Sequence, residues 1–273
     1  MRGQVVELVR YPVKGCAGES LDRVNVGPMG LADDRLFMVV DANGKFITQR
    51  TRPAMAVIRP RLADGRLTVS APDMADASFD VLRDGEHMEV LLHSWTGKGV
   101  DQGDEPAAWF SDYMGEPCRL VRILPDHERR SSGLTEGYVG FADAHALHVT
   151  SLASLDHLNS RITANGGVGA LPMNRFRPNV VVSGWPEPHT EDRVRGMTIG
   201  AIEVGYEKRA VRCVVPTVDQ ATGRKAGHEP TKTLATYRRE PDGGVSFGTK
   251  FAVVTPGTVG VGDPVSVSSW EED

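Results

Sequence analysis

Residues 36–48 have the sequence LFMVVDANGKFIT, and this stretch carries the clearest fold signal in the chain. Residues 36–40 and 45–48 are two short apolar runs of the kind found in β-strands. They flank Asp41-Ala42-Asn43-Gly44, in which the Asn-Gly pair favours the positive backbone φ angles of a tight turn. The stretch therefore predicts a β-hairpin.

The same pattern of short apolar runs broken by turn residues continues on both sides of this hairpin. Further strands are predicted at residues 5–11, 56–62, 66–70, 88–92, 179–183, 198–204, 251–255 and 265–268. Helical spacing is limited to residues 104–114, 152–162 and 231–239, with expected N-caps at Asp104, at Thr150-Ser151 and at Thr231. These patterns predict a mainly β (α+β) fold, an antiparallel barrel-like structure with peripheral helices. A polar stretch without periodicity at residues 125–135 indicates a boundary between two domains.

Composition excludes several classes of protein. Lysine and arginine number 31 against 36 aspartates and glutamates, so the net charge of −5 gives no electrostatic case for nucleic-acid binding. The N-terminus has no signal-peptide pattern, and no apolar run approaches the roughly 18 residues that a membrane span needs. We therefore expect a cytoplasmic protein that does not enter the membrane.

The cysteines restrict the redox chemistry that the chain can perform by itself. Cys16, Cys118 and Cys213 lie far apart and form no Cys-x-x-Cys pair. Three thiols cannot supply the four cysteines of a conventional iron–sulfur cluster or of an all-cysteine zinc site. If the protein does redox chemistry, its electrons must come from another molecule.

The strongest candidate for chemistry is Cys213, in the segment Val211-Arg212-Cys213-Val214-Val215-Pro216-Thr217-Val218-Asp219. Arg209 and Arg212 precede the cysteine closely, and positive charge favours the thiolate, which binds soft metals and attacks electrophiles. A buried, inert cysteine at the end of a strand is the competing interpretation.

This segment resembles the signature of MOSC-domain proteins, and several other motifs follow that family in the same order. Tyr11-Pro12-Val13-Lys14, Gly30-Leu31-Ala32-Asp33-Asp34-Arg35 and Phe176-Arg177-Pro178-Asn179 are similar to three further family motifs, and residues 256–265 fit the family's C-terminal segment. The likeness is greatest to the mitochondrial amidoxime-reducing components and the YcbX-like molybdenum enzymes. It implies a MOSC N-terminal β-barrel-like domain at residues 1–124, packed on a MOSC β-barrel domain with peripheral helices at residues 125–273.

The resemblance also assigns roles to individual residues. It implies that Cys213 ligates molybdenum and that Asp219 takes part in catalysis. The residues that it places at the molybdenum cofactor (Mo-molybdopterin) are Lys14, Arg35, Thr150, Ser151, Arg177 and Arg212. Lysine and arginine suit the cofactor's phosphate, and Thr150-Ser151 precedes a helix whose free N–H groups attract anions. Without the family context, Lys14 and Arg35 are ordinary surface cations, Thr150-Ser151 is a plain cap and Arg177 pairs with a carboxylate.

The implied function is reduction of N-hydroxylated compounds, namely amidoximes, hydroxylamines and N-hydroxylated bases. The family also has an association with pyridoxal phosphate binding. YcbX-like relatives carry a C-terminal ferredoxin-like domain, which residues 1–273 do not contain, so we expect a separate electron-transfer protein: a ferredoxin or a cytochrome b5-type protein, with a flavin reductase.

Two alternatives remain open at the level of sequence. The chain could be a non-redox MOSC protein that carries the cofactor, or sulfur as a Cys213 persulfide. It could also be a cysteine hydrolase in which His145 or His148 assists Cys213. Both histidines precede the cap at Thr150, and a structural role is as compatible with the sequence as a proton-donating one.

Overall fold

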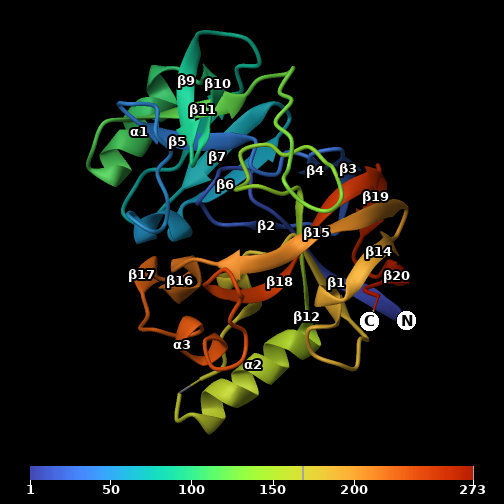
Figure 1. The fold of residues 1–273 in the computed structure, drawn as a ribbon. Helices are drawn as coiled ribbons and strands as arrows, with labels where there is room; N and C mark the ends of the chain where they lie inside the picture. Colours follow the sequence, from blue (N-terminus) through green and yellow to red (C-terminus); the bar gives the residue numbers. More distant parts are fainter. Residues whose placement is uncertain (168, 273) are drawn as a thin grey trace.

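A computed structural model describes residues 1–167 and 169–272; Val168 and Asp273, both within the expected MOSC domain, lie outside the described residues. The fold is mainly β, with 42% of residues in strands and 15% in helices, which confirms the predicted fold class. The two lobes of the molecule, one formed mainly by the blue-to-green part of the chain and one by the yellow-to-red part, are visible in Figure 1.

The yellow-to-red lobe contains a closed barrel of seven strands. In spatial order they are β1 (Arg2–Arg10), β13 (Val180–Ser183), β12 (Leu147–Ser151), β18 (Val245–Thr255), β15 (Ile202–Arg212), β14 (Val194–Ile199) and β20 (Pro264–Trp270), and β20 pairs with β1 again. All neighbours are antiparallel except β12 and β13. The N-terminal strand is therefore part of the barrel, and the two chain ends meet where the N–H of Val267 donates to the carbonyl of Met1.

The other lobe is built from two antiparallel sheets and one helix. The first sheet contains β5 (Phe37–Asp41), β11 (Cys118–Ile123), β10 (Trp95–Asp101) and β9 (His87–Leu92), and the second contains β6 (Arg59–Ala63), β7 (Arg66–Ser70) and β8 (Ala77–Asp80). Helix α1 (Asp104–Met114) ends at Gly115 in the left-handed conformation, as its sequence predicts. The expected N-cap at Asp104 was wrong, because the N-cap is Gly103, without a side-chain hydrogen bond, and Asp104 is already helical. The remaining short strands are β2 (Glu19–Ser20), β3 (Arg23–Gly27), β4 (Gly30–Leu31), β16 (Val218–Asp219), β17 (Arg224–Lys225) and β19 (Gly257–Gly260).

Helices α2 (Leu152–Ala164) and α3 (Thr231–Leu234) lie outside the barrel wall (Figure 1). Leu155, Leu158 and Ile162 form the buried face of α2, as helical spacing predicts. The third predicted helix was too long, because it ends at Leu234 and the chain then turns to form a β-bridge between Arg239 and Val245. Its N-cap is Pro230, without a side-chain hydrogen bond, so the expected cap at Thr231 was also wrong.

One predicted strand proved to be two. Residues 198–204 span the end of β14, a turn at Gly200-Ala201 and the start of β15. Gly200 has a φ of 55°, a conformation that glycine adopts without steric cost. The apolar run therefore belongs to a hairpin rather than to a single strand. Among the described residues, no helix is both long and apolar enough to cross a membrane.

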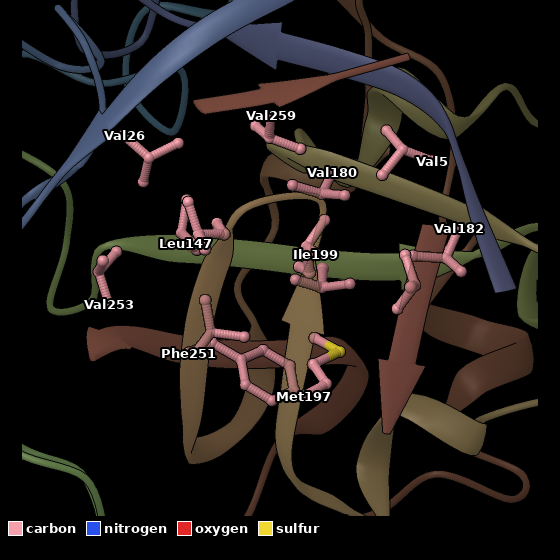
Figure 2. Close-up of a cluster of buried hydrophobic side chains, with 14 of the residues drawn as sticks. Val5, Val26, Leu147, Val180, Val182, Met197, Ile199, Phe251, Val253 and Val259 are labelled. Carbon is pink, nitrogen blue, oxygen red and sulfur yellow. The ribbon is translucent and has the colours of Figure 1, made fainter. Parts of the chain in front are cut away.

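The interior of the barrel is packed with apolar side chains from every strand. Figure 2 shows Val5, Leu147, Val180, Met197 and Phe251 pointing towards a common centre. Phe251 has no exposed surface. Val5 and Leu8 of β1 belong to the same cluster, so β1 supplies core residues as well as backbone pairing. The boundary expected between residues 124 and 125 remains a prediction, and the structure adds that the barrel takes its first strand from before it.

We expect Phe251→Ala to lower the free energy of unfolding by about 3–5 kcal/mol, because it leaves a cavity in this core. Val254→Ala is the matched control on the same strand: Val254 is 56% exposed, and its truncation should change stability by less than about 0.5 kcal/mol. Equilibrium unfolding in urea measures both. Equal effects of the two substitutions would contradict the packing described here.

Candidate functional site

A cavity of about 470 Å³ is lined by residues from both lobes. Its walls carry eight lysine and arginine side chains against two aspartates, Asp143 and Asp242. The eight cations are Lys14, Arg35, Arg50, Arg177, Lys208, Arg209, Arg212 and Lys250. The protein as a whole is acidic, so this concentration of positive charge is local to the cavity. A cavity of this size and sign is suited to a small anionic molecule.

Five of the residues nominated from the sequence line this one cavity: Lys14, Arg35, Arg177, Arg212 and Cys213. They come from positions up to 199 residues apart, the separation of Lys14 and Cys213. The other three, Thr150, Ser151 and Asp219, are not among its lining residues.

Lys14 lies where the chain leaves β1 and crosses towards the other lobe. Its amine pairs with the carboxylate of Asp143, and Nε2 of His93 lies 3.3 Å from the same carboxylate. Burial lowers the pKa of Lys14, an effect that Asp143 opposes. Lys14 is thus a buried cation whose partner carboxylate also faces the cavity.

Arg35 and Arg177 share the ring of Tyr11. Their guanidinium carbons lie 4.3 Å and 4.2 Å from the ring centroid, within cation–π distance. Asp34 pairs with Arg35, and Oδ1 of Asn179 accepts a hydrogen bond of 3.1 Å from it. Burial lowers the pKa of Arg177 to about 10. The aromatic ring thus keeps two like charges side by side in fixed orientations.

The backbone at both arginines is in the left-handed region, with φ angles of 48° at Arg35 and 56° at Arg177. Such conformations are costly for residues other than glycine and cluster at functional sites. Both cations that share the Tyr11 ring have this costly conformation, which favours a functional role for this part of the cavity.

Cys213 directly follows the last residue of β15, and its thiol is exposed. The neighbouring Arg212 donates a hydrogen bond of 2.9 Å to the carbonyl of Phe176. Nε of Arg212 is buried without a hydrogen-bond partner among the residues that the structure describes. An accessible thiol beside an unsatisfied N–H donor is a combination that a bound anionic group would complete.

The histidines left open by the sequence both line the cavity. Nδ1 of His145 lies 2.8 Å from Oε2 of the fully buried Glu207, and burial lowers the pKa of this histidine. Nε2 of His148 lies 3.2 Å from the carbonyl of Phe247, to which it can only donate. Gly248, with a φ of 75°, makes room for this ring, because a Cβ atom there would collide with Nε2.

Sequence reasoning missed Lys208, Lys250 and Glu207. Each stands in a strand where it resembles an ordinary solvent-facing charge, and no motif marks it. Only the alignment of β15 with β18 shows that Lys208 and Lys250 are direct neighbours.

Thr150 and Ser151 lie at the end of β12, on the α2 side. Ser151 is the N-cap of α2, as predicted, and its Oγ accepts a hydrogen bond from the N–H of Ser154. The Ser151 hydroxyl also donates to the buried carboxylate of Glu191 at 3.0 Å, and Thr150 contacts the sulfur of Met173. In this arrangement both hydroxyls already have partners.

Asp219 pairs with Arg175 at 2.9 Å and accepts hydrogen bonds from the N–H groups of Ala221 and Thr222. These contacts fix the loop that follows Cys213. The adjacent Gln220 bonds to Gln49 of the other lobe at 2.9 Å and to Arg177 at 3.3 Å. Asp219 therefore stabilises the loop that follows Cys213.

Comparison with known proteins gives two family matches along the chain. Residues 2–117 match the MOSC N-terminal beta barrel domain, and residues 136–266 match the MOSC domain. The chain is 32% identical to mitochondrial amidoxime-reducing component 1 of Mus musculus and 33% identical to mitochondrial amidoxime reducing component 2 of Rattus norvegicus. Each of these matches covers 96% of this chain and 82% of the relative.

Among solved structures, the YUAD protein from Bacillus subtilis matches 97% of this chain and 94% of its own, with a TM-score of 0.43 and 11% identity. A likeness at this level carries no argument about function. None of these matches supports the expected association with pyridoxal phosphate.

The environment of Glu191 predicts a dependence of stability on pH. Burial raises the pKa of the Glu191 carboxyl from 4.5 to about 7, and neighbouring Asp192 acts in the same direction. Between these two values the folded protein holds a proton that the unfolded chain releases, so the free energy of unfolding falls as the pH rises through this window.

Glu191→Gln should remove on the order of 3 kcal/mol of this pH dependence. Urea unfolding of the parent and the variant at several values between pH 4.5 and 8 measures it. Glu187→Gln, at an exposed position nearby, is the control and should keep the parent's slope. The assignment fails if Glu191→Gln keeps that slope too.

Proposed function

Because the chain belongs to the MOSC-domain family that includes the mitochondrial amidoxime-reducing components, we propose that it is a molybdenum cofactor-dependent reductase of N-hydroxylated compounds. The substrates would be amidoximes, hydroxylamines or N-hydroxylated bases. The observation that carries the proposal is the convergence of Lys14, Arg35, Arg177, Arg212 and Cys213 on one cavity.

The residues at this cavity fit the cofactor chemically. Molybdopterin carries a phosphate and a dithiolene, and its metal is one that a thiolate can ligate. Arginine binds phosphate with two parallel N–H donors, and Arg35 and Arg177 are held in fixed orientations against Tyr11. The orphan Nε of Arg212 stands next to Cys213, the proposed metal ligand.

In the proposed reaction, the N–OH group of the substrate, two electrons and two protons give an N–H group and water. When bound, the cofactor would supply the two electrons and the site that takes up the hydroxyl oxygen. The protein's part is to bind, orient and deliver protons.

His145 is placed to handle a proton. His145 lines the cavity, and Glu207 lies against Nδ1 and so favours the proton on that nitrogen. Nε2, which is buried without a hydrogen-bond partner among the described residues, is then the nitrogen that can receive or release one. Gly133 allows Glu207 to be buried there, because a Cβ atom at position 133 would collide with the glutamate side chain. His148, engaged with the Phe247 carbonyl, has a positioning role.

The remaining nominated residues have supporting roles in this proposal. Asp219, through Arg175 and the N–H groups of its own turn, holds the loop that presents Cys213. Thr150 and Ser151 shape the end of β12, just beyond His148 and Val149. We also propose that the chain divides into two domains between residues 124 and 125, as the family organisation implies. In this division β1 belongs to the first domain by sequence but completes the barrel of the second.

Electrons would come from a separate protein, a ferredoxin or a cytochrome b5-type protein served by a flavin reductase. Because Cys213 is exposed at the cavity, such a donor would be able to approach the residue proposed to ligate the metal. Activity with dithionite but with none of these donors would support the chemistry and reject the partner.

The central test is metal content. Protein made in a host that synthesises molybdopterin should purify with molybdenum and should reduce benzamidoxime to benzamidine under dithionite. Absence of molybdenum after gentle purification contradicts the proposal. Sulfur that cyanide releases from such a metal-free protein, and that Cys213→Ala abolishes, would establish the persulfide carrier instead.

Cys213→Ser should lower benzamidoxime reduction by more than about 100-fold, because it removes the thiolate proposed to ligate the metal, and removal even of residues behind a metal ligand typically costs about 10–100-fold. Cys118→Ser, at a buried cysteine away from the cavity, is the matched control and should keep the metal. Metal analysis and initial rates measure the two variants. Parental activity in a molybdenum-loaded Cys213→Ser variant would show that Cys213 is not the ligand.

A further inference from the structure

Three basic side chains form a row across neighbouring strands of the barrel wall. Lys208 on β15 is the direct partner of Lys250 on β18, and Lys250 is in turn the direct partner of His148 on β12. All three line the cavity. Directly paired residues of antiparallel strands project from the same face, with Cβ atoms about 4.5–5.5 Å apart.

This row is unfavourable by itself. Like charges directly opposite each other destabilise a sheet. Within residues 1–167 and 169–272, no carboxylate lies within ion-pair distance of Lys208 or Lys250, in contrast to Lys14, which has Asp143. Burial, with Arg212 and Arg35 adding to it, lowers the pKa of Lys250 well below its usual range. An anion between the two lysines would relieve this repulsion.

The backbone of β15 is irregular at the same place. Its pairing with β18 shifts register between Tyr206 and Lys208 and again between Arg209 and Val211. Such bulges redirect side chains and are frequent beside active sites. Here one bulge lets Glu207 turn inward to His145 while the next residue, Lys208, lines the cavity.

Three of the residues proposed to grip the cofactor come from loops. Lys14 lies just after β1, Arg35 between β4 and β5, and Arg177 just before β13, whereas the two lysines stand on barrel strands. Arg212 is the exception, because it ends β15, the strand that carries Lys208. The amidine product of a simple amidoxime is a strong base and a cation at neutral pH, so unpaired lysines do not complement it. They complement a negative group.

We propose that the Lys208–Lys250 pair binds an anionic group, a carboxylate or a phosphate, carried by the substrate. This inference rests on the proposed function and deepens it: the preferred substrates are N-hydroxylated compounds with a negatively charged substituent. The same chemistry could come from a second phosphate on the cofactor, as in a dinucleotide form, and the experiment separates the two sources.

The kinetic arm compares benzamidoxime with 4-carboxybenzamidoxime in the cofactor-loaded protein. We expect kcat/KM to favour the carboxylate by about tenfold or more, the size of one charge-assisted interaction. The double variant Lys208→Gln, Lys250→Gln should bring the ratio of the two kcat/KM values close to one. Lys208→Arg keeps the charge and should keep most of the preference.

Lys98→Gln is the matched control, since Lys98 is an exposed lysine on β10 that does not line the cavity. It should leave the ratio unchanged. A ratio of one or below in the parent, or an unaltered ratio in the double variant, overturns the inference.

The binding arm uses calorimetry on the purified protein without an electron donor, so that no turnover occurs. 4-Carboxybenzamidoxime should bind more tightly than benzamidoxime to the parent, and the double variant should lose this difference. If neither compound is reduced but the difference in binding is present, the reductase proposal fails and the anion site stands. If the cofactor released on denaturation carries a second phosphate, the lysines belong to the cofactor and the inference is overturned.

Discussion

The pairing of β1 with β13 on one side and β20 on the other is the constraint on which the site depends. It closes the barrel, and it fixes the point at which the chain leaves the barrel for the other lobe. Tyr11 follows directly, with its hydroxyl donating to the carbonyl of Pro178 at 3.1 Å. Because Lys14 and Arg35 are placed by this segment, the N-terminal part of the chain reaches Arg177 and Cys213 only when β1 is in register.

The cavity that results collects positive charge in a place where charge is costly. Burial opposes the charged forms of Lys14, Arg177 and Lys250, as the direction of each pKa shift shows. The groups that offset this cost differ from one side of the cavity to the other. Tyr11 and Asp34 stabilise the arginine pair, Asp143 stabilises Lys14, and the two paired lysines have no such carboxylate among the described residues. The arginine pair and Lys14 thus have stabilising partners within the protein, whereas the two paired lysines would gain theirs only from a bound anion.

The loop around Cys213 is stabilised mainly by hydrogen bonds rather than by compensation between buried charges. Asp219, Arg175 and Gln220 fix the loop beyond the thiol, and Gln49 ties that loop to the other lobe. The thiol itself remains exposed, while the loop beyond it is held by hydrogen bonds and an ion pair. The arrangement suits a ligand residue that must stay accessible and yet be held in one position.

The sequence by itself determined the mainly β class, helices α1 and α2 and the cysteine motif, because these depend on local periodicity, caps and turn residues. It also nominated Lys14, Arg35, Arg177, Arg212 and Cys213, through motifs that belong to a family. It could not distinguish those five from Thr150, Ser151 and Asp219, since which side of a strand end faces the cavity depends on packing. Nor could it find the hairpin turn at Gly200 inside an apolar run, or the early end of α3. Only the tertiary structure placed Glu207 behind His145 and Lys208 opposite Lys250, because strand register and the register shifts on either side of Lys208 arise from pairing between segments about 40 residues apart.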